Sequence, residues 1–190
     1  MLTLFNFVVF FHIIFAILWV GSAVMLELLE WEATHTNKRE RLALALHRGE
    51  WFAMRVFVPC AIGTLLTGIL GVAVGRPTFS QAWVIIALIA VVVVSGIGGG
   101  VIGRTTGQLS KLIKDPEVHE DVVEAKLLSI RGWVYLDLAI LFFILFDMVM
   151  RPANLTIAFS TISIIYFLAV FGVIMFERRS RTASLLKGYN

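Results

Sequence analysis

Long runs of apolar residues, separated by short polar segments, dominate the chain. Each run is close to the roughly 20 residues that a helix needs to cross the hydrocarbon core of a bilayer. We therefore expect an all-α transmembrane bundle that forms a single domain over residues 1–190. Its five membrane-spanning helices are predicted at about residues 2–29, 52–75, 82–103, 132–150 and 155–176.

The overall composition agrees with this pattern. Of the 190 residues, 59% are hydrophobic and 15% are charged, whereas a soluble domain has about 45–50% apolar and about 25% charged residues. This excludes disorder and argues against a water-soluble fold. The single cysteine, Cys60, also excludes an intramolecular disulfide and a cysteine metal cluster.

The basic residues explain the net charge of +3 and predict the orientation. Thirteen of the 16 lysines and arginines lie in the first and third connections and in the C-terminal tail, and only two lie in the other two connections. Because basic residues collect on the cytoplasmic side of a membrane, the N-terminus should be outside and the C-terminus cytoplasmic. This placement indicates lipid as the partner of these charges, so we expect no nucleic acid.

The connections carry clear helix punctuation. After Pro77, the segment Thr78-Phe79-Ser80-Gln81 has a capping-box pattern. Such a short connection predicts a tight hairpin, with the helices at 52–75 and 82–103 as antiparallel neighbours.

The third connection predicts an amphipathic helix on the inner side. Asp115 can cap a helix that has Pro116 at its first position. Val118, Val122 and Ala125 would then share one face, which suits an extension of the fourth span along the membrane interface. The alternative is a docking surface for a cytoplasmic partner.

Glycines recur at a spacing of four residues in the second and third spans. Gly71 and Gly75 are one such pair, and Gly96 and Gly100 are another. Small residues at this spacing let helix backbones approach closely, so we expect a packing role. The alternative for Gly96 and Gly100 is that they make room for a flat cofactor or for a helix of another subunit.

His12 is the strongest candidate functional residue, because ionisable side chains within a span are costly and rare. On a helical wheel it shares a stripe with Ala16, Trp19, Ala23 and Glu30, which should face the protein interior. A neutral imidazole at this position can ligate haem iron or another metal, or hydrogen-bond a quinone. The alternative is a structural histidine bonded to a neighbouring helix.

Two acidic residues stand in the fourth predicted span. Asp147 is at roughly the depth of His12, and a His12–Asp147 pair would fix the tautomer of the imidazole. Asp137 is at the level of Arg55 and Glu27, so we expect a structural ion cluster near the inner surface.

The first span resembles a known superfamily through the motif His12-x6-Trp19-x-Gly21. This loose group of small bacterial membrane proteins includes the HemJ-type protoporphyrinogen oxidases, the copper-resistance protein D family and a family of predicted integral membrane proteins. The last is the most similar, since the segment from Arg131 to Pro152 also resembles its penultimate helix. In the HemJ-type members the first-span histidine is a ligand of haem b. The resemblance therefore implies that His12 binds haem iron, although no span here has the lysine that those enzymes need.

These observations lead to one principal hypothesis and two alternatives. The principal hypothesis is a bacterial inner-membrane protein in which His12, with Trp19 and Asp147 beside it, binds haem b. Its function would be electron transfer or porphyrin-linked chemistry, and a quinone or a porphyrin would be its small-molecule partner. The first alternative is a non-catalytic accessory subunit of a respiratory or photosynthetic complex, in contact with other membrane subunits or with copies of itself. The second is a metal or small-solute permease. No complete catalytic set is present, so whether the protein is an enzyme stays open.

Overall fold

Helices make up all the regular structure in the part of the chain that the computed structural model describes, which is residues 3–35, 39–75, 77–115 and 117–152. Two of the helical segments, η1 and η2, are π-helical. In chain order the elements are α1 (Leu4–His35), α2 (Arg39–Phe52), η1 (Ala53–Phe57), α3 (Val58–Val74), α4 (Ala82–Ser95), η2 (Gly96–Ile102), α5 (Gly103–Lys114) and α6 (Glu120–Met150).

The elements join into four long rods, because η1 continues α2 into α3 and η2 continues α4 into α5 without a break. Each rod contains a stretch that is long and apolar enough to cross a membrane: Leu4–Leu29, Leu42–Val74, Ala82–Lys114 and Asp121–Met150. Four of the predicted helices are thus confirmed. Three of them extend well beyond the predicted inner bounds, since a helix does not end where its sequence becomes amphipathic. The fifth predicted span, 155–176, lies outside the described residues.

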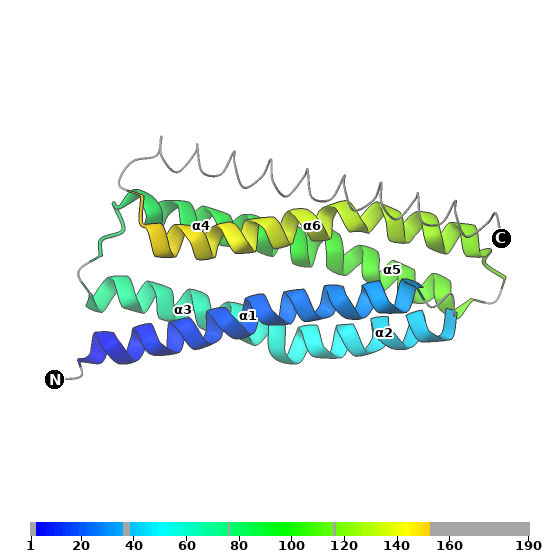
Figure 1. The fold of residues 1–190 in the computed structure, drawn as a ribbon, viewed down its shortest axis with the longest axis horizontal. Coiled ribbons are helices and arrows are strands. Elements are labelled where there is room, and N and C mark those ends of the chain that lie inside the picture. Colours follow the sequence, from blue (N-terminus) through cyan, green and yellow to red (C-terminus); the bar gives the residue numbers. More distant parts are fainter. Residues whose placement is uncertain (1–2, 36–38, 76, 116, 153–190) are drawn as a thin grey trace, which may run out of the picture.

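The rods form two layers (Figure 1). In one layer α1 packs against α3, and in the other α4 packs against α6. The second and third spans were predicted to be antiparallel neighbours, and this holds only in part. Their rods meet through α2 and α5 and in one apolar cluster, whereas the main partner of α3 is α1 and that of α4 is α6. A short connection limits the distance between two helix ends, but it does not choose the face on which either helix packs.

Where α1 and α3 meet, side chains of α1 pack against glycines of α3. The α1 residues follow one another at alternating intervals of three and four, the spacing of a continuous helix–helix seam. The pairs are Phe5 with Gly75, Val8 with Gly71, His12 with Gly68 and Phe15 with Gly63. A Cβ at position 63 would lie only 2.8 Å from Cδ1 of Phe15. The absence of side chains on this face of α3 is therefore what lets α1 approach.

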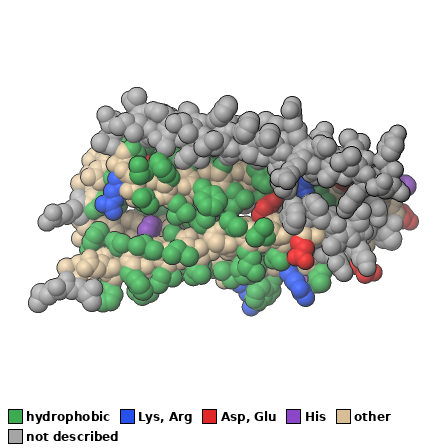
Figure 2. Space-filling model, viewed as in Figure 1, with side chains coloured by type: hydrophobic (Ala, Val, Ile, Leu, Met, Phe, Trp, Pro, Cys, Tyr) green, Lys and Arg blue, Asp and Glu red, His purple; other side chains and the backbone are tan. Residues whose placement is uncertain are grey.

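Two clusters of buried apolar side chains hold the layers together. The central cluster draws on α1, α3, α4 and α6, and consists of Trp19, Val20, Cys60, Val94 and Leu141. The second lies at the end of the bundle formed by α2, α5 and the start of α6, and consists of Leu42, Leu46, Leu109, Ile113 and Val123. Figure 2 shows acidic side chains gathered toward this same end, while hydrophobic side chains cover much of the rest of that face.

The third connection differs from its prediction. Asp115 is not the N-cap of the next helix but the C-cap of α5. Its Oδ1 accepts a hydrogen bond from the backbone N–H of Glu117 at 3.0 Å, which makes a local turn. The helix begins only at Glu120. It buries Val123, whereas Val122 is exposed, because the cluster with α2 and α5 selects a different face from the one that the apolar pattern suggested.

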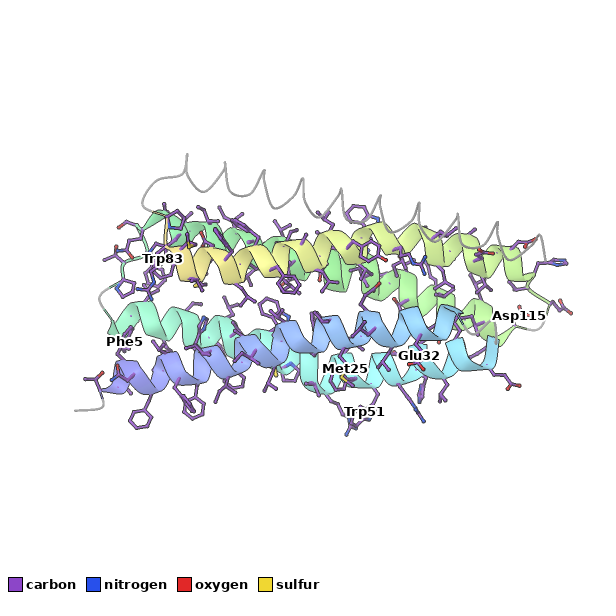
Figure 3. The ribbon with its side chains drawn as sticks, in the orientation of Figure 1. Phe5, Met25, Glu32, Trp51, Trp83 and Asp115 are labelled. Carbon is purple, nitrogen blue, oxygen red and sulfur yellow. The ribbon has the colours of Figure 1, made fainter. Side chains whose placement is uncertain are left out.

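At the opposite end of the bundle, α6 terminates against α4. Arg151 caps α6 in the left-handed region with φ of 45°, and its N–H donates to the carbonyl of Asp147. Its guanidinium lies 5.4 Å from the ring centroid of Trp83, at the start of α4 (Figure 3). This cation–π contact joins the ends of the two helices.

The glycine seam can be tested by adding single methyl groups. We expect Gly63→Ala to destabilise the bundle by about 1–3 kcal/mol, because the new Cβ overlaps the Phe15 ring. Gly21→Ala on α1 is the matched control, since a Cβ there meets no described atom within 4 Å. Thermal unfolding in detergent, followed by circular dichroism, would compare the two. Equal melting temperatures for both variants would contradict this packing.

Candidate functional site

His12 is held by the backbone of α3. Its Nδ1 lies 2.9 Å from the carbonyl oxygen of Thr64 and 3.3 Å from Oγ1 of Thr67. A carbonyl oxygen can only accept, so Nδ1 must be the donor in the shorter bond. The hydroxyl of Thr67 gives its own proton to carbonyl oxygens, Gly63 O at 2.5 Å or Thr64 O at 3.2 Å. Both contacts therefore place the ring proton on Nδ1.

This tautomer decides what the imidazole can do. With the proton on Nδ1, a neutral ring has a lone pair on Nε2. An Nδ1–H bonded to a carbonyl is the arrangement that orients histidines which ligate metals through Nε2. His12 is half-buried, so the helices described here do not fully enclose it. The ring is thus held by Thr64 through Nδ1, and its described hydrogen bonds leave the lone pair of Nε2 unused.

Gly68 supplies the space in which the ring lies. A Cβ at this position would be 3.1 Å from Cε1 of His12, which is closer than ordinary van der Waals contact. Sequence reasoning missed Thr64, Thr67 and Gly68. The signal that could have found them is a polar threonine pair beside glycines within an apolar span, one helical turn apart on the same face.

Asp147 does not pair with His12, as the sequence had predicted. Its side chain is 1% exposed, and neither carboxylate oxygen has a hydrogen-bond partner among the described residues. The predicted His12–Asp147 pair is therefore absent, because the Nδ1 proton of His12 points to α3 in its own layer whereas Asp147 belongs to α6 in the other. Thr64, and not a carboxylate, orients the imidazole.

The predicted ion cluster near the inner surface is also absent. Arg55 lies over the ring of Trp51 at 4.9 Å, and Trp51 points away from the bundle (Figure 3). Glu27 is attracted instead by Arg131 of α6. Asp137 is left buried, 6% exposed, with no partner for its Oδ1 in the described part of the chain.

Trp19 lies in the central cluster, two turns beyond His12 along α1. Its side chain is 2% exposed, and its ring packs edge-on against Phe57 with centroids 6.2 Å apart. Its Nε1–H has no acceptor within the described residues. These contacts make Trp19 a central packing residue, and its proposed part in a cofactor pocket remains a prediction.

Within residues 3–152, apart from the undescribed positions, no three His, Cys, Asp or Glu side chains come together as a metal site. A group that needs several protein ligands therefore has no candidate site in this part of the structure. A cofactor that needs one nitrogen ligand has a candidate in Nε2 of His12.

The chain belongs to a family of predicted integral membrane proteins (DUF2269), whose model matches residues 6–152. The match includes α1 with His12 and Trp19, and α6 with Asp137 and Asp147. The protein is thus an integral membrane protein, and its apolar helices are in contact with a lipid bilayer. No curated protein and no solved structure matches it. The resemblance to HemJ-type and copper-resistance proteins is not confirmed by these comparisons.

The tautomer of His12 can be measured directly. In ¹⁵N-labelled protein at neutral pH we expect Nδ1 to be protonated and Nε2 to have the chemical shift of an unprotonated ring nitrogen, because Thr64 O can only accept. Histidine-selective spectra of the wild type and of His12→Ala would assign the signals. An unprotonated Nδ1, with the ring proton on Nε2, would contradict the hydrogen bond to Thr64.

Proposed function

We propose that this protein binds a redox cofactor, haem b, within the membrane through Nε2 of His12. The observation that carries the proposal is the Nδ1–H bond from His12 to the carbonyl of Thr64, which leaves Nε2 as the free lone pair. Haem would supply one-electron redox chemistry. The protein would orient the imidazole of His12 and keep the haem within the low-dielectric interior of the membrane.

The residues at hand fit such a group. Haem iron needs only one strong protein ligand, and a histidine with an oriented Nδ1–H is a usual one. Because Gly68 has no Cβ, the imidazole can lie against α3 without a close contact. Oγ1 of Thr67 is a second acceptor for the Nδ1 proton. Trp19 and Asp147 remain the other proposed residues of the pocket. Asp147 supports this role through its two unpartnered oxygens, since a buried polar atom normally has a partner.

The tautomer also discriminates among the small molecules that His12 could bind. An Nε2 with a lone pair can ligate iron or accept a hydrogen bond, but it cannot donate one to a quinone carbonyl. A quinone would therefore need another donor, whereas a hydroquinone hydroxyl or a porphyrin-bound iron fits the lone pair. We infer electron transfer or porphyrin-linked chemistry as the reaction class.

A second candidate function is that of a non-catalytic subunit in a larger membrane complex. One observation favours it: a Cβ added at Gly96, Gly99 or Gly100 of η2 would meet nothing within 4 Å in the described structure. Three glycines without a close neighbour offer a surface on which a further helix could pack closely.

We also propose the finer topology: five spans, with the N-terminus outside, the C-terminus in the cytoplasm and the protein in the inner membrane of a bacterium. The distribution of basic residues supports this orientation. It places the connection between α3 and α4 outside, and the turn between α5 and α6 inside.

Visible absorption spectroscopy tests the haem proposal. The protein purified from cells supplied with haem precursors should show a Soret band and a reduced α-band. His12→Ala should lose at least nine-tenths of that absorbance, because the iron loses its ligand. The control is His47→Ala on α2, an exposed histidine, which should keep the spectrum. A colourless but helical wild-type protein would refute the proposal and favour the subunit function.

The orientation can be tested by cysteine labelling. In a Cys60→Ser background, Ser80→Cys between α3 and α4 and Glu117→Cys between α5 and α6 both place an exposed thiol in a connection. A membrane-impermeant maleimide applied to intact spheroplasts should label position 80 only, and position 117 only after lysis. The reverse pattern would mean that the protein has the opposite orientation.

A further inference from the structure

Two buried polar side chains, Trp19 of α1 and Asp137 of α6, have atoms without a hydrogen-bond partner among the described residues, and these atoms are of opposite kinds. Nε1 of Trp19 is a donor, and Oδ1 of Asp137 is an acceptor. Both side chains are more than nine-tenths buried, at 2% and 6% exposure. Unpaired polar groups in a bundle interior are costly and rare, so two of them in one region call for a ligand that satisfies both.

The packing brings the two side chains to the same part of the bundle. Trp19 belongs to the central cluster with Val94 and Leu141, and Leu138 packs against this cluster. Asp137 is the neighbour of Leu138 in the chain and lies one turn from Leu141. α1 and α6 are in contact. Trp19 thus belongs to the same cluster as Leu141, which lies one turn along α6 from Asp137.

The π-helix η2 leaves the side of Asp137 open. A Cβ at Gly98 would lie 3.9 Å from Oδ1 of Asp137, in ordinary contact, and glycine leaves this position without a side chain. π-Helical turns within α-helices are rare and occur frequently at functional sites. Here the π-helix places a glycine, and no larger residue, beside the unpaired carboxyl oxygen.

We propose that Trp19 and Asp137 bind a water molecule between them, and that Asp137 exchanges a proton with it. Water fits because it accepts from the indole N–H and donates to the carboxylate, whereas a metal cation would meet the positive end of the N–H bond. The exchange is balanced: a hydronium ion gives one proton to the carboxylate, leaving a neutral carboxylic acid and the bound water. The site shares Trp19 with the proposed haem pocket but does not include His12, and it needs no cofactor.

Few other charges act on this site in the described structure. Neither α4 nor η2 contains a titratable side chain apart from hydroxyls. Cys60 of α3 lies in the central cluster. The nearest charged residues along α1 and α6 are Glu27 and Arg131, two turns away, and these two attract each other. Asp137 is therefore the group through which a proton would enter this part of the membrane interior.

Infrared spectroscopy of the full-length protein in nanodiscs tests the proposal. A carboxylic-acid C=O band is expected, which shifts to lower frequency in D₂O because its proton exchanges with water. Asp137→Asn, a change of nearly equal size, should remove this band. The control variant Asp121→Asn, at an exposed position of the same helix, should keep it. A band that is absent, or that D₂O does not shift, would overturn the proposal.

A second measurement separates a bound water from a merely buried acid. The indole ¹⁵N–¹H signal of Trp19, assigned with Trp19→Phe, should show magnetisation transfer from water in the wild type. In Asp137→Asn this signal should shift, because the water loses its acceptor. A Trp19 signal that receives no transfer from water, or that is the same in Asp137→Asn, would refute the shared site even if Trp19→Phe fails to fold.

Discussion

The hydrogen bond from His12 to the backbone of α3 depends on how closely α1 and α3 approach, and that approach depends on glycine. In a membrane the hydrophobic effect does not draw helices together, so close packing and interhelical hydrogen bonds must do so. Gly63, Gly68, Gly71 and Gly75 remove the side chains that would separate the two backbones. The imidazole can then reach a carbonyl that would otherwise be enclosed by its own helix. The position, the tautomer and the available chemistry of His12 all follow from this contact.

The two layers differ in how they treat polar atoms. Between α1 and α3, His12 and both threonines have partners. Among the described residues, the buried side-chain atoms without hydrogen-bond partners belong to Trp19 of α1, in the cluster that joins the layers, and to Asp137 and Asp147 of α6. The polar side chains at the α1–α3 contact are thus paired, whereas those between the layers and on α6 are not. The proposed haem ligand, His12, is held by hydrogen bonds within the described structure. The proposed water site, in contrast, is inferred from polar atoms that have no such bonds.

Much of this could be predicted from the sequence, and the errors share one cause. Four helices were correctly predicted, because hydropathy over about 20 residues is a local property. His12 was selected because a lone ionisable group stands out in an apolar run. Its partner was wrong: Asp147 is the obvious carboxylate, yet Thr64 makes the bond through its backbone, and a backbone carbonyl leaves no mark in a sequence. The expected ion cluster of Arg55 with Asp137 is also absent, since the guanidinium of Arg55 lies over the ring of Trp51, one turn away in the same rod.

The sequence by itself determined that this chain is helical and lies in a membrane, because apolar runs of about 20 residues have the length of a helix that crosses a bilayer, and a helix bonds its own peptide groups there. It also identified the few polar side chains within the membrane-spanning segments that need a hydrogen-bond partner or a function. Only the tertiary structure decided which helix faces meet, and therefore that α3 and not α6 orients His12. The reason is physical: many faces of an apolar helix are equally compatible with lipid, so the choice among them is made by the shape of the neighbouring helix, here a row of glycines.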